Sequence, residues 1–150
     1  MSKLDNLYAF ASERAIDIVH DKFSEEKKAV CMYIKPEKVI FRDKPAIEND
    51  YEEVTILAEE IGHFETGALY LITSTHNTPI ARNNRMKFEA KARRWAFQKY
   101  LPPHEIEQAI MHEGDNDHAI AEYCSVTVDF LRSAIEYYQS IGVVFNVEAA

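Results

Sequence analysis

Apolar residues recur at helical spacing over most of the chain, which predicts a largely helical protein. Between residues 3 and 22 they repeat every three or four positions, so we expect one amphipathic helix there. A second helix is predicted over residues 51–65, because the capping residues Glu48, Asn49 and Asp50 directly precede an apolar stripe. Further helices are predicted over residues 85–101, 104–112, 117–123 and 128–140, and Pro102 and Pro103 end the first of these.

Two short apolar runs have a different character and predict strands. Residues 29–34 and 39–41 are rich in valine, isoleucine, tyrosine and phenylalanine, and the turn 35–38 separates them. Residues 66–84 begin with an apolar segment and continue as a polar loop, and the tail 142–150 is short and apolar. With no repeat or linker, this order predicts a single α+β domain over residues 1–150, in which a small antiparallel sheet packs against a mostly helical remainder.

Composition narrows the classes of function. Hydrophobic residues make up 47% of the chain and charged residues 28%, which is typical of a globular protein, and the formal net charge is -8. A field of that sign repels nucleic acid and anionic membranes. We find no signal-peptide pattern and no apolar stretch long enough for a membrane span, so a cytoplasmic protein is expected. Cys31 and Cys124 lie in apolar surroundings and are expected to be reduced core residues.

The candidate chemistry lies in the second predicted helix, where Glu59-Glu60-Ile61-Gly62-His63 differs in one position from the zinc-protease pattern H-E-x-x-H. Residues at i and i+4 face the same side of a helix, so Glu59 and His63 can share a metal ion, and Glu60 takes the position of the general base. The neighbouring apolar stripe lies beside this pair. An alternative stays open: the acidic residues face solvent, and His63 is a structural histidine.

A second motif, further along the chain, makes the interpretation of the first as a metal-binding motif more specific. Residues 54–66 (VTILAEEIGHFET) are followed by a helix in which Glu89, Ala92, Trp95, Ala96 and Pro102 match the pattern E-x-x-A-x-x-F-A-x-x-L-x-P, with Trp95 in the place of Phe and Pro102 one position late. This pair of motifs resembles the ImmA/IrrE family of metallopeptidases, and the resemblance covers roughly residues 3–141. It implies a zincin-like fold with a metal site between the two helices.

The resemblance also implies roles for individual residues. His63 and Glu89 would be metal ligands, Glu60 the base that acts through water, and Gly62 the point where a neighbouring helix approaches closely. Glu59 stands where the family has its first histidine ligand. A carboxylate can still bind zinc, but a more anionic ligand set weakens the preference for zinc and admits manganese or iron.

The resemblance implies a metal-dependent endopeptidase of a phage or mobile element that cleaves a helix-turn-helix repressor. The alternative is an inactive relative that binds such a regulatory protein without cutting it. Residues 117–140 have the spacing of a helix-turn-helix, but their exposed positions are too acidic for groove binding, so we expect no direct contact with nucleic acid. His76, in the polar loop, is a further nitrogen that could replace the missing ligand.

Overall fold

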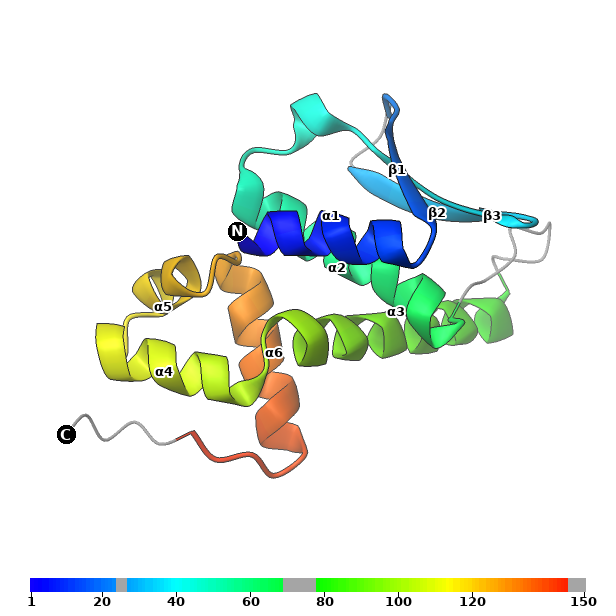
Figure 1. Cartoon of the computed structure of the whole chain (residues 1–150). Coiled ribbons are helices and arrows are strands. Elements are labelled where there is room, and N and C mark those ends of the chain that lie inside the picture. The colour runs from blue at the N-terminus through cyan, green and yellow to red at the C-terminus, as the bar shows by residue number, and fades with distance from the viewer. Residues whose placement is uncertain (24–26, 69–77, 146–150) are drawn as a thin grey trace.

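The computed structural model describes residues 1–23, 27–68 and 78–145, and these form six α-helices, a short 3-10 turn and a three-stranded sheet (Figure 1). The elements are α1 (Lys3–Glu13), β1 (Ile16–His20), β2 (Ala29–Ile34), β3 (Glu37–Arg42), η1 (Lys44–Ala46), α2 (Asp50–Thr66), α3 (Pro79–Tyr100), α4 (Pro103–Glu113), α5 (Asp117–Tyr123) and α6 (Val128–Ser140). The predicted α+β class is therefore confirmed.

The N-terminal segment differs from its prediction. The helix predicted over residues 3–22 ends at Glu13, and Ala15 adopts a left-handed conformation with φ of 55° that turns the chain into β1. Ile16 is buried and Ile18 half-buried on one face of that strand, while Asp17 and Val19 are exposed on the other. The prediction of a continuous helix was wrong because apolar residues two positions apart also suit a strand that has a partner to pair with.

The sheet is mixed, with strand order β1-β3-β2. β2 pairs with β3 in antiparallel orientation, as predicted, whereas β1 pairs with β3 in parallel orientation. Ile40 in the central strand lies opposite both Ile18 and Cys31 and is fully buried. Directly opposed residues project from the same face of a sheet, so this row of three side chains faces the interior of the protein.

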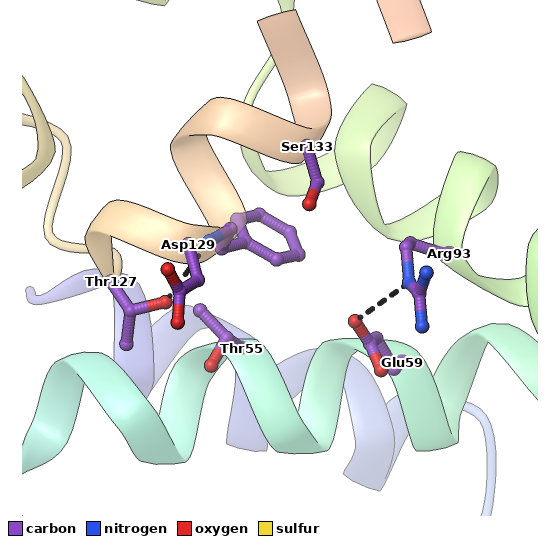
Figure 2. A pocket seen from close by; sticks show the side chains of 7 residues that line it. Thr55, Glu59, Arg93, Thr127, Asp129 and Ser133 are labelled. Carbon is purple, nitrogen blue, oxygen red and sulfur yellow. Dashed lines mark hydrogen bonds and ion pairs between the residues drawn. The ribbon is translucent and has the colours of Figure 1, made fainter. Parts of the chain in front are cut away.

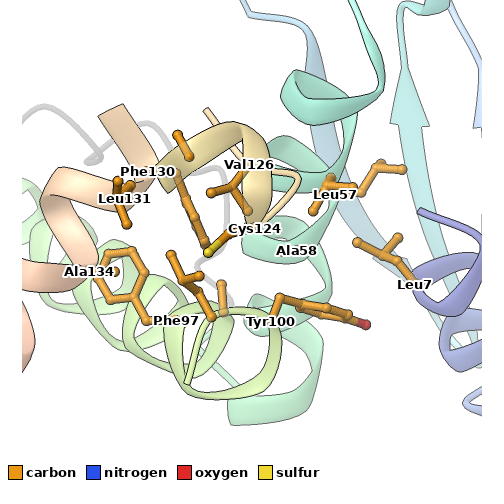
Figure 3. Packing of buried hydrophobic residues seen from close by; sticks show 14 of the residues in the cluster. Leu7, Leu57, Ala58, Phe97, Tyr100, Cys124, Val126, Phe130, Leu131 and Ala134 are labelled. Atoms are coloured by element: carbon orange, nitrogen blue, oxygen red, sulfur yellow. The ribbon is translucent and has the colours of Figure 1, made fainter. Parts of the chain in front are cut away.

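Helix α2 is the central element, in contact with α1, β2, β3 and α3. The side chain of Asn49 caps its first turn by accepting a hydrogen bond from the backbone N–H of Glu52, and Gly67 ends it in the left-handed conformation. The predicted apolar stripe is confirmed, because Val54, Leu57, Ala58 and Ile61 are all buried. Figure 3 shows Leu57 and Ala58 with Leu7 of α1 on one side and residues of α6 on the other.

A buried carboxylate ties α2 to the sheet. Glu53 is fully buried and accepts hydrogen bonds from the Tyr8 hydroxyl at 2.6 Å, from Arg42 Nε at 3.1 Å and from Lys44 Nζ. Burial alone would raise the pKa of Glu53, but the bonds from Lys44 and Tyr8 outweigh it and hold this pKa below its usual value. The network orients the N-terminal half of α2 relative to β3 and thereby supports the half that carries the motif.

Helix α3 begins at Pro79, before the predicted start at residue 85, and the Thr78 side chain caps it. Pro at the first helical position is typical of a helix start. The apolar segment predicted within residues 66–84 falls largely outside the described residues. Among the described residues no helix is long and apolar enough to cross a membrane.

The last three helices agree with their predictions. α5 and α6 have the predicted bounds, α4 differs by one residue at each end, and Thr127 caps α6 by accepting a hydrogen bond from the N–H of Phe130. Phe130 also packs edge-to-face on Phe97 of α3, with ring centroids 5.1 Å apart (Figure 3). The Tyr138 hydroxyl donates a hydrogen bond to the carbonyl of Leu101 at 3.0 Å. These contacts fix the helix-turn-helix-like pair against α3.

Helices α2 and α3 approach each other most closely at Gly62. A Cβ atom added there would overlap the carbonyl oxygen of Ala92 and would lie 3.1 Å from its carbonyl carbon. Both contacts are with backbone, which cannot rotate away. The close approach expected at Gly62 is therefore confirmed, and it sets the distance between the two motif helices.

We expect Gly62→Ala to lower the free energy of unfolding by about 1–3 kcal/mol, the usual cost of overpacking a well-packed interior. Replacing glycine by alanine inside a helix ordinarily stabilises a protein by about 0.5–1 kcal/mol, so the sign of the change is diagnostic. Urea denaturation followed by circular dichroism measures it. An increase in stability would show that α2 and α3 are not in backbone contact at this position.

Candidate functional site

The antiparallel packing of α2 and α3 places two pairs of polar side chains opposite each other. His63 of α2 meets Glu89 of α3, and one turn away Glu59 of α2 meets Arg93 of α3. Each helix contributes residues four positions apart, which lie on one face. Both motifs found in the sequence therefore face each other across the same helix interface.

His63 is buried and held at both ring nitrogens. Nδ1 lies 2.7 Å from the carbonyl oxygen of Ala68, and because a carbonyl only accepts, Nδ1 carries the proton. Nε2 lies 3.3 Å from Oε2 of Glu89. Burial lowers the pKa of His63, but the bonds with Glu89 and with Ala68 outweigh it, and the pKa is raised above its usual value. A backbone carbonyl at Nδ1 is also the usual means of orienting a metal-binding histidine.

Glu60 is half-buried on α2, and its carboxyl group interacts with the His63–Glu89 pair. Burial raises the pKa of its carboxyl group, interactions with His63 and with Cys31 of β2 oppose the rise, and the charge of Glu89 adds to it. The net result is a raised pKa. A carboxylate whose pKa is shifted toward neutrality is a better general base at physiological pH than an ordinary one.

Glu59 is directed toward Arg93, as Figure 2 shows. Its Oε1 accepts a hydrogen bond from Arg93 Nε at 3.3 Å. The pair borders an open pocket of about 300 Å³, which Thr55, Thr127, Asp129, Phe130 and Ser133 also line. Burial raises the pKa of Glu59, and Arg93 partly offsets this effect.

The residues fit a metal ion in part. His63 and Glu89 present an imidazole nitrogen and a carboxylate oxygen to each other, whereas Glu59 is held by Arg93. Within the described ranges, no three His, Cys, Asp or Glu side chains are arranged as a metal-binding group. A metal ion held by His63 and Glu89 therefore needs a third protein ligand that changes its present contacts.

The other histidines are exposed, stacked on another ring, or outside the residues that the structure describes. The candidate ligand His76 falls outside the described residues. His104 and His118 are exposed, and the His112 ring stacks on Tyr123 with centroids 5.2 Å apart. The basic residues of α3 are largely exposed, and Trp95 packs on Phe10.

Two residues of the site were not recognised in the sequence. The sequence by itself gave Arg93 no role, and it predicted Cys31 only as a core residue. The signal for Arg93 is its position four residues after Glu89, which mirrors the spacing of Glu59 and His63. Antiparallel helices with equal spacings bring both pairs together. For Cys31 the sequence offers no comparable signal, because its neighbour on α2 depends on strand order.

No protein-family model matches this chain, and searches of curated proteins and of solved structures find no similar protein. The resemblance to the ImmA/IrrE family is therefore a hypothesis carried by the two motifs.

We expect Glu89→Gln to lower the pKa of His63 in metal-free protein, because it removes the carboxylate that favours the imidazolium. NMR titration of the His63 ring protons measures this change. Since the folded-state pKa is raised above 6.5, the pair stabilises the fold at low pH, and this stabilisation is lost as the pH rises through the folded pKa. Glu59→Gln is the matched control, because Glu59 pairs with Arg93 and should leave His63 unchanged. An unaltered pKa in Glu89→Gln would contradict the pairing.

Proposed function

We propose that this chain is a metal-dependent endopeptidase of the ImmA/IrrE type, which acts in the cytoplasm on a regulatory protein of a phage or mobile element. The observation that carries the proposal is the pair formed by His63 and Glu89, with His63 Nδ1 bonded to a backbone carbonyl and the half-buried Glu60 interacting with both residues. A sheet packed against the motif helix is consistent with a zincin-like fold. The motif resemblance favours a helix-turn-helix repressor as substrate.

In this proposal His63 Nε2 and the Glu89 carboxylate hold the metal, and Glu59 is the third candidate ligand. The metal would polarise the scissile carbonyl and lower the pKa of a bound water. Zinc suits an imidazole, while manganese or iron suits a set rich in carboxylates. The ion would replace the proton shared by His63 and Glu89, so its affinity should fall as the pH is lowered.

Glu60 is the general base in this scheme. Its raised pKa lets it take a proton from water near neutral pH and return it to the leaving amine. Gly62 keeps α3 close enough for Glu89 to reach His63. These residues thus have distinct roles, since His63 and Glu89 bind the metal, Glu60 moves a proton, and Gly62 sets the spacing of the helices.

A second candidate function is favoured by the ion pair between Glu59 and Arg93. The Arg93 guanidinium neutralises the Glu59 carboxylate. That carboxylate would have to bind the metal in place of the first histidine ligand of the family. In that case the chain is a relative of the peptidases that binds a regulatory protein without cutting it. Both candidate functions share the partner and differ in whether the site takes a metal.

Glu60→Gln should leave folding and metal content unchanged while cleavage of the regulator falls on the order of 10²-fold or more, as for loss of a general base. Glu65→Gln is the matched control, because it makes the same change on the same helix at a residue that pairs with Arg14 near the surface. The assay uses purified regulator encoded next to this gene and follows its fragmentation. Equal cleavage by wild type and Glu60→Gln would remove Glu60 from the mechanism.

Zinc affinity separates the two candidate functions. We expect Glu59→His to raise it substantially, since imidazole is a better zinc ligand than an additional carboxylate. Arg93→Ala should raise it about tenfold, the equivalent of roughly 1.4 kcal/mol, because the change releases Glu59 and removes a positive charge. Glu89→Ala should abolish binding, and Arg94→Ala, a neighbouring exposed arginine, should have no effect.

Isothermal titration calorimetry of these proteins with zinc is the measurement. Loss of a partly exposed ion pair costs only about 0–1 kcal/mol, so Arg93→Ala should remain folded. Negligible binding by wild type, Glu59→His and Arg93→Ala alike would favour the second candidate, a binding protein without a metal.

A further inference from the structure

The open pocket of about 300 Å³ between α2, α3 and α6 is built from two similar walls (Figure 2). Thr55 and Glu59 line it from α2, and Asp129 and Ser133 line it from α6. The residues of each pair are four positions apart and therefore lie on one face of their helix. Each wall thus contributes one carboxylate and one hydroxyl group to the pocket.

The charges in the pocket are not balanced. Among the described residues that line it, Arg93 of α3 is the only basic one, and its Nε atom donates a hydrogen bond to Glu59 Oε1 at 3.3 Å. Asp129 is exposed and makes no ion pair within the described part of the chain. The lining therefore holds two carboxylates and one guanidinium, so one further cation balances it, whereas an anionic ligand meets a surplus of negative charge.

The neutral groups of the pocket also suit a ligand that donates hydrogen bonds. The Thr127 hydroxyl oxygen accepts a hydrogen bond from the backbone N–H of Phe130 at 3.2 Å. The Thr55 hydroxyl donates to the carbonyl of Glu52 at 2.9 Å. A hydroxyl oxygen has two lone pairs, so both can accept a further bond, and the side chains of lysine and arginine carry only donors. A basic side chain therefore matches the pocket in charge and in hydrogen bonding.

We propose that this pocket binds a lysine or arginine side chain of the regulatory protein on which the chain acts. The inference rests on the proposed function for the identity of that partner, while the pocket itself needs no metal. Thr55, Glu59 and His63 follow at intervals of four along α2, so the pocket lies about one helical turn, roughly 6 Å, from the His63–Glu89 pair. An extended peptide covers that distance in about two residues. The basic side chain then fixes the register of the bound segment relative to the candidate metal site.

Blocked amino acids test the pocket without any assay of activity. The probes are N-acetyl-arginine amide and N-acetyl-lysine amide, and N-acetyl-citrulline amide is the matched control, because citrulline has the shape of arginine without its charge. NMR spectra of the backbone amides follow the titrations in the presence of a metal chelator. We expect both cationic probes to shift the amides of Thr55, Arg93 and Ser133 saturably, with a Kd on the order of 1 mM for so small a ligand. Citrulline should give no saturable shift.

Two variants locate the binding. Asp129→Asn should weaken binding of the arginine probe about tenfold or more, because it removes the carboxylate that has no ion-pair partner in the described structure. Glu113→Gln, at an exposed residue of α4 that does not line the pocket, removes the same charge and should leave the affinity unchanged. This comparison separates a local contact from general attraction to a protein of net charge -8.

The outcomes distinguish this inference from the proposed function. Equal shifts with citrulline, shifts spread over the surface without saturation, or equal affinity in Asp129→Asn would each overturn the inference and leave the metal site untouched, because the titrations contain no metal. Absence of zinc binding would remove the metalloendopeptidase and leave saturable binding of arginine in place. Should Asp129→Asn fail to fold, the comparison of arginine with citrulline on wild type decides by itself.

Discussion

The backbone contact between α2 and α3 at Gly62 is the constraint on which the candidate site depends. Because no side chain separates the helices there, the carbonyl of Ala92 approaches the motif helix directly. Side chains that flank this contact, three residues before Gly62 and one residue after it, can then reach across the interface. His63 contacts Glu89 and Glu59 contacts Arg93 at the same distance of 3.3 Å. A wider helix separation would break both contacts at once.

The candidate site carries more acidic than basic groups in a partly buried position. This imbalance affects both the stability of the fold and the pKa values of the site residues. Carboxylates removed from water need a partner of opposite charge or a proton. At Glu59 the partner is Arg93, whereas Glu60 and Glu89 share His63. The raised pKa values of Glu60 and His63 are the direct consequence. A cation would satisfy the same groups that protons satisfy in the metal-free protein.

The two ends of the helix interface therefore differ in character. At one end the ion pair of Glu59 and Arg93 borders an open polar pocket between α2, α3 and α6. At the other end the buried His63 pairs with the partly exposed Glu89, and the half-buried Glu60 interacts with both. A peptidase would use the second end, whereas a protein that only binds its partner has no need for the balance of charges found there.

Much of the local structure was determined by the sequence alone. Strand β2 and the helices α5 and α6 have their predicted bounds, and the apolar stripe of α2 is buried as its periodicity indicates. The caps Asn49 and Thr127 also act as their residue types predict. These features depend on interactions within a few residues of the chain, which is why pattern and propensity suffice to predict them. The same spacing argument put Glu59 and His63 on one face.

Only the tertiary structure decided which partners those residues meet. The strand β1 forms because β3 offers it a parallel neighbour, and without that neighbour its sequence suits a helix equally well. Arg93 has the pattern of a solvated charge until the helix packing places it opposite Glu59, and Cys31 reaches Glu60 only through the order of the strands. Periodicity shows which face of an element is buried, but it carries no information on what lies across from it.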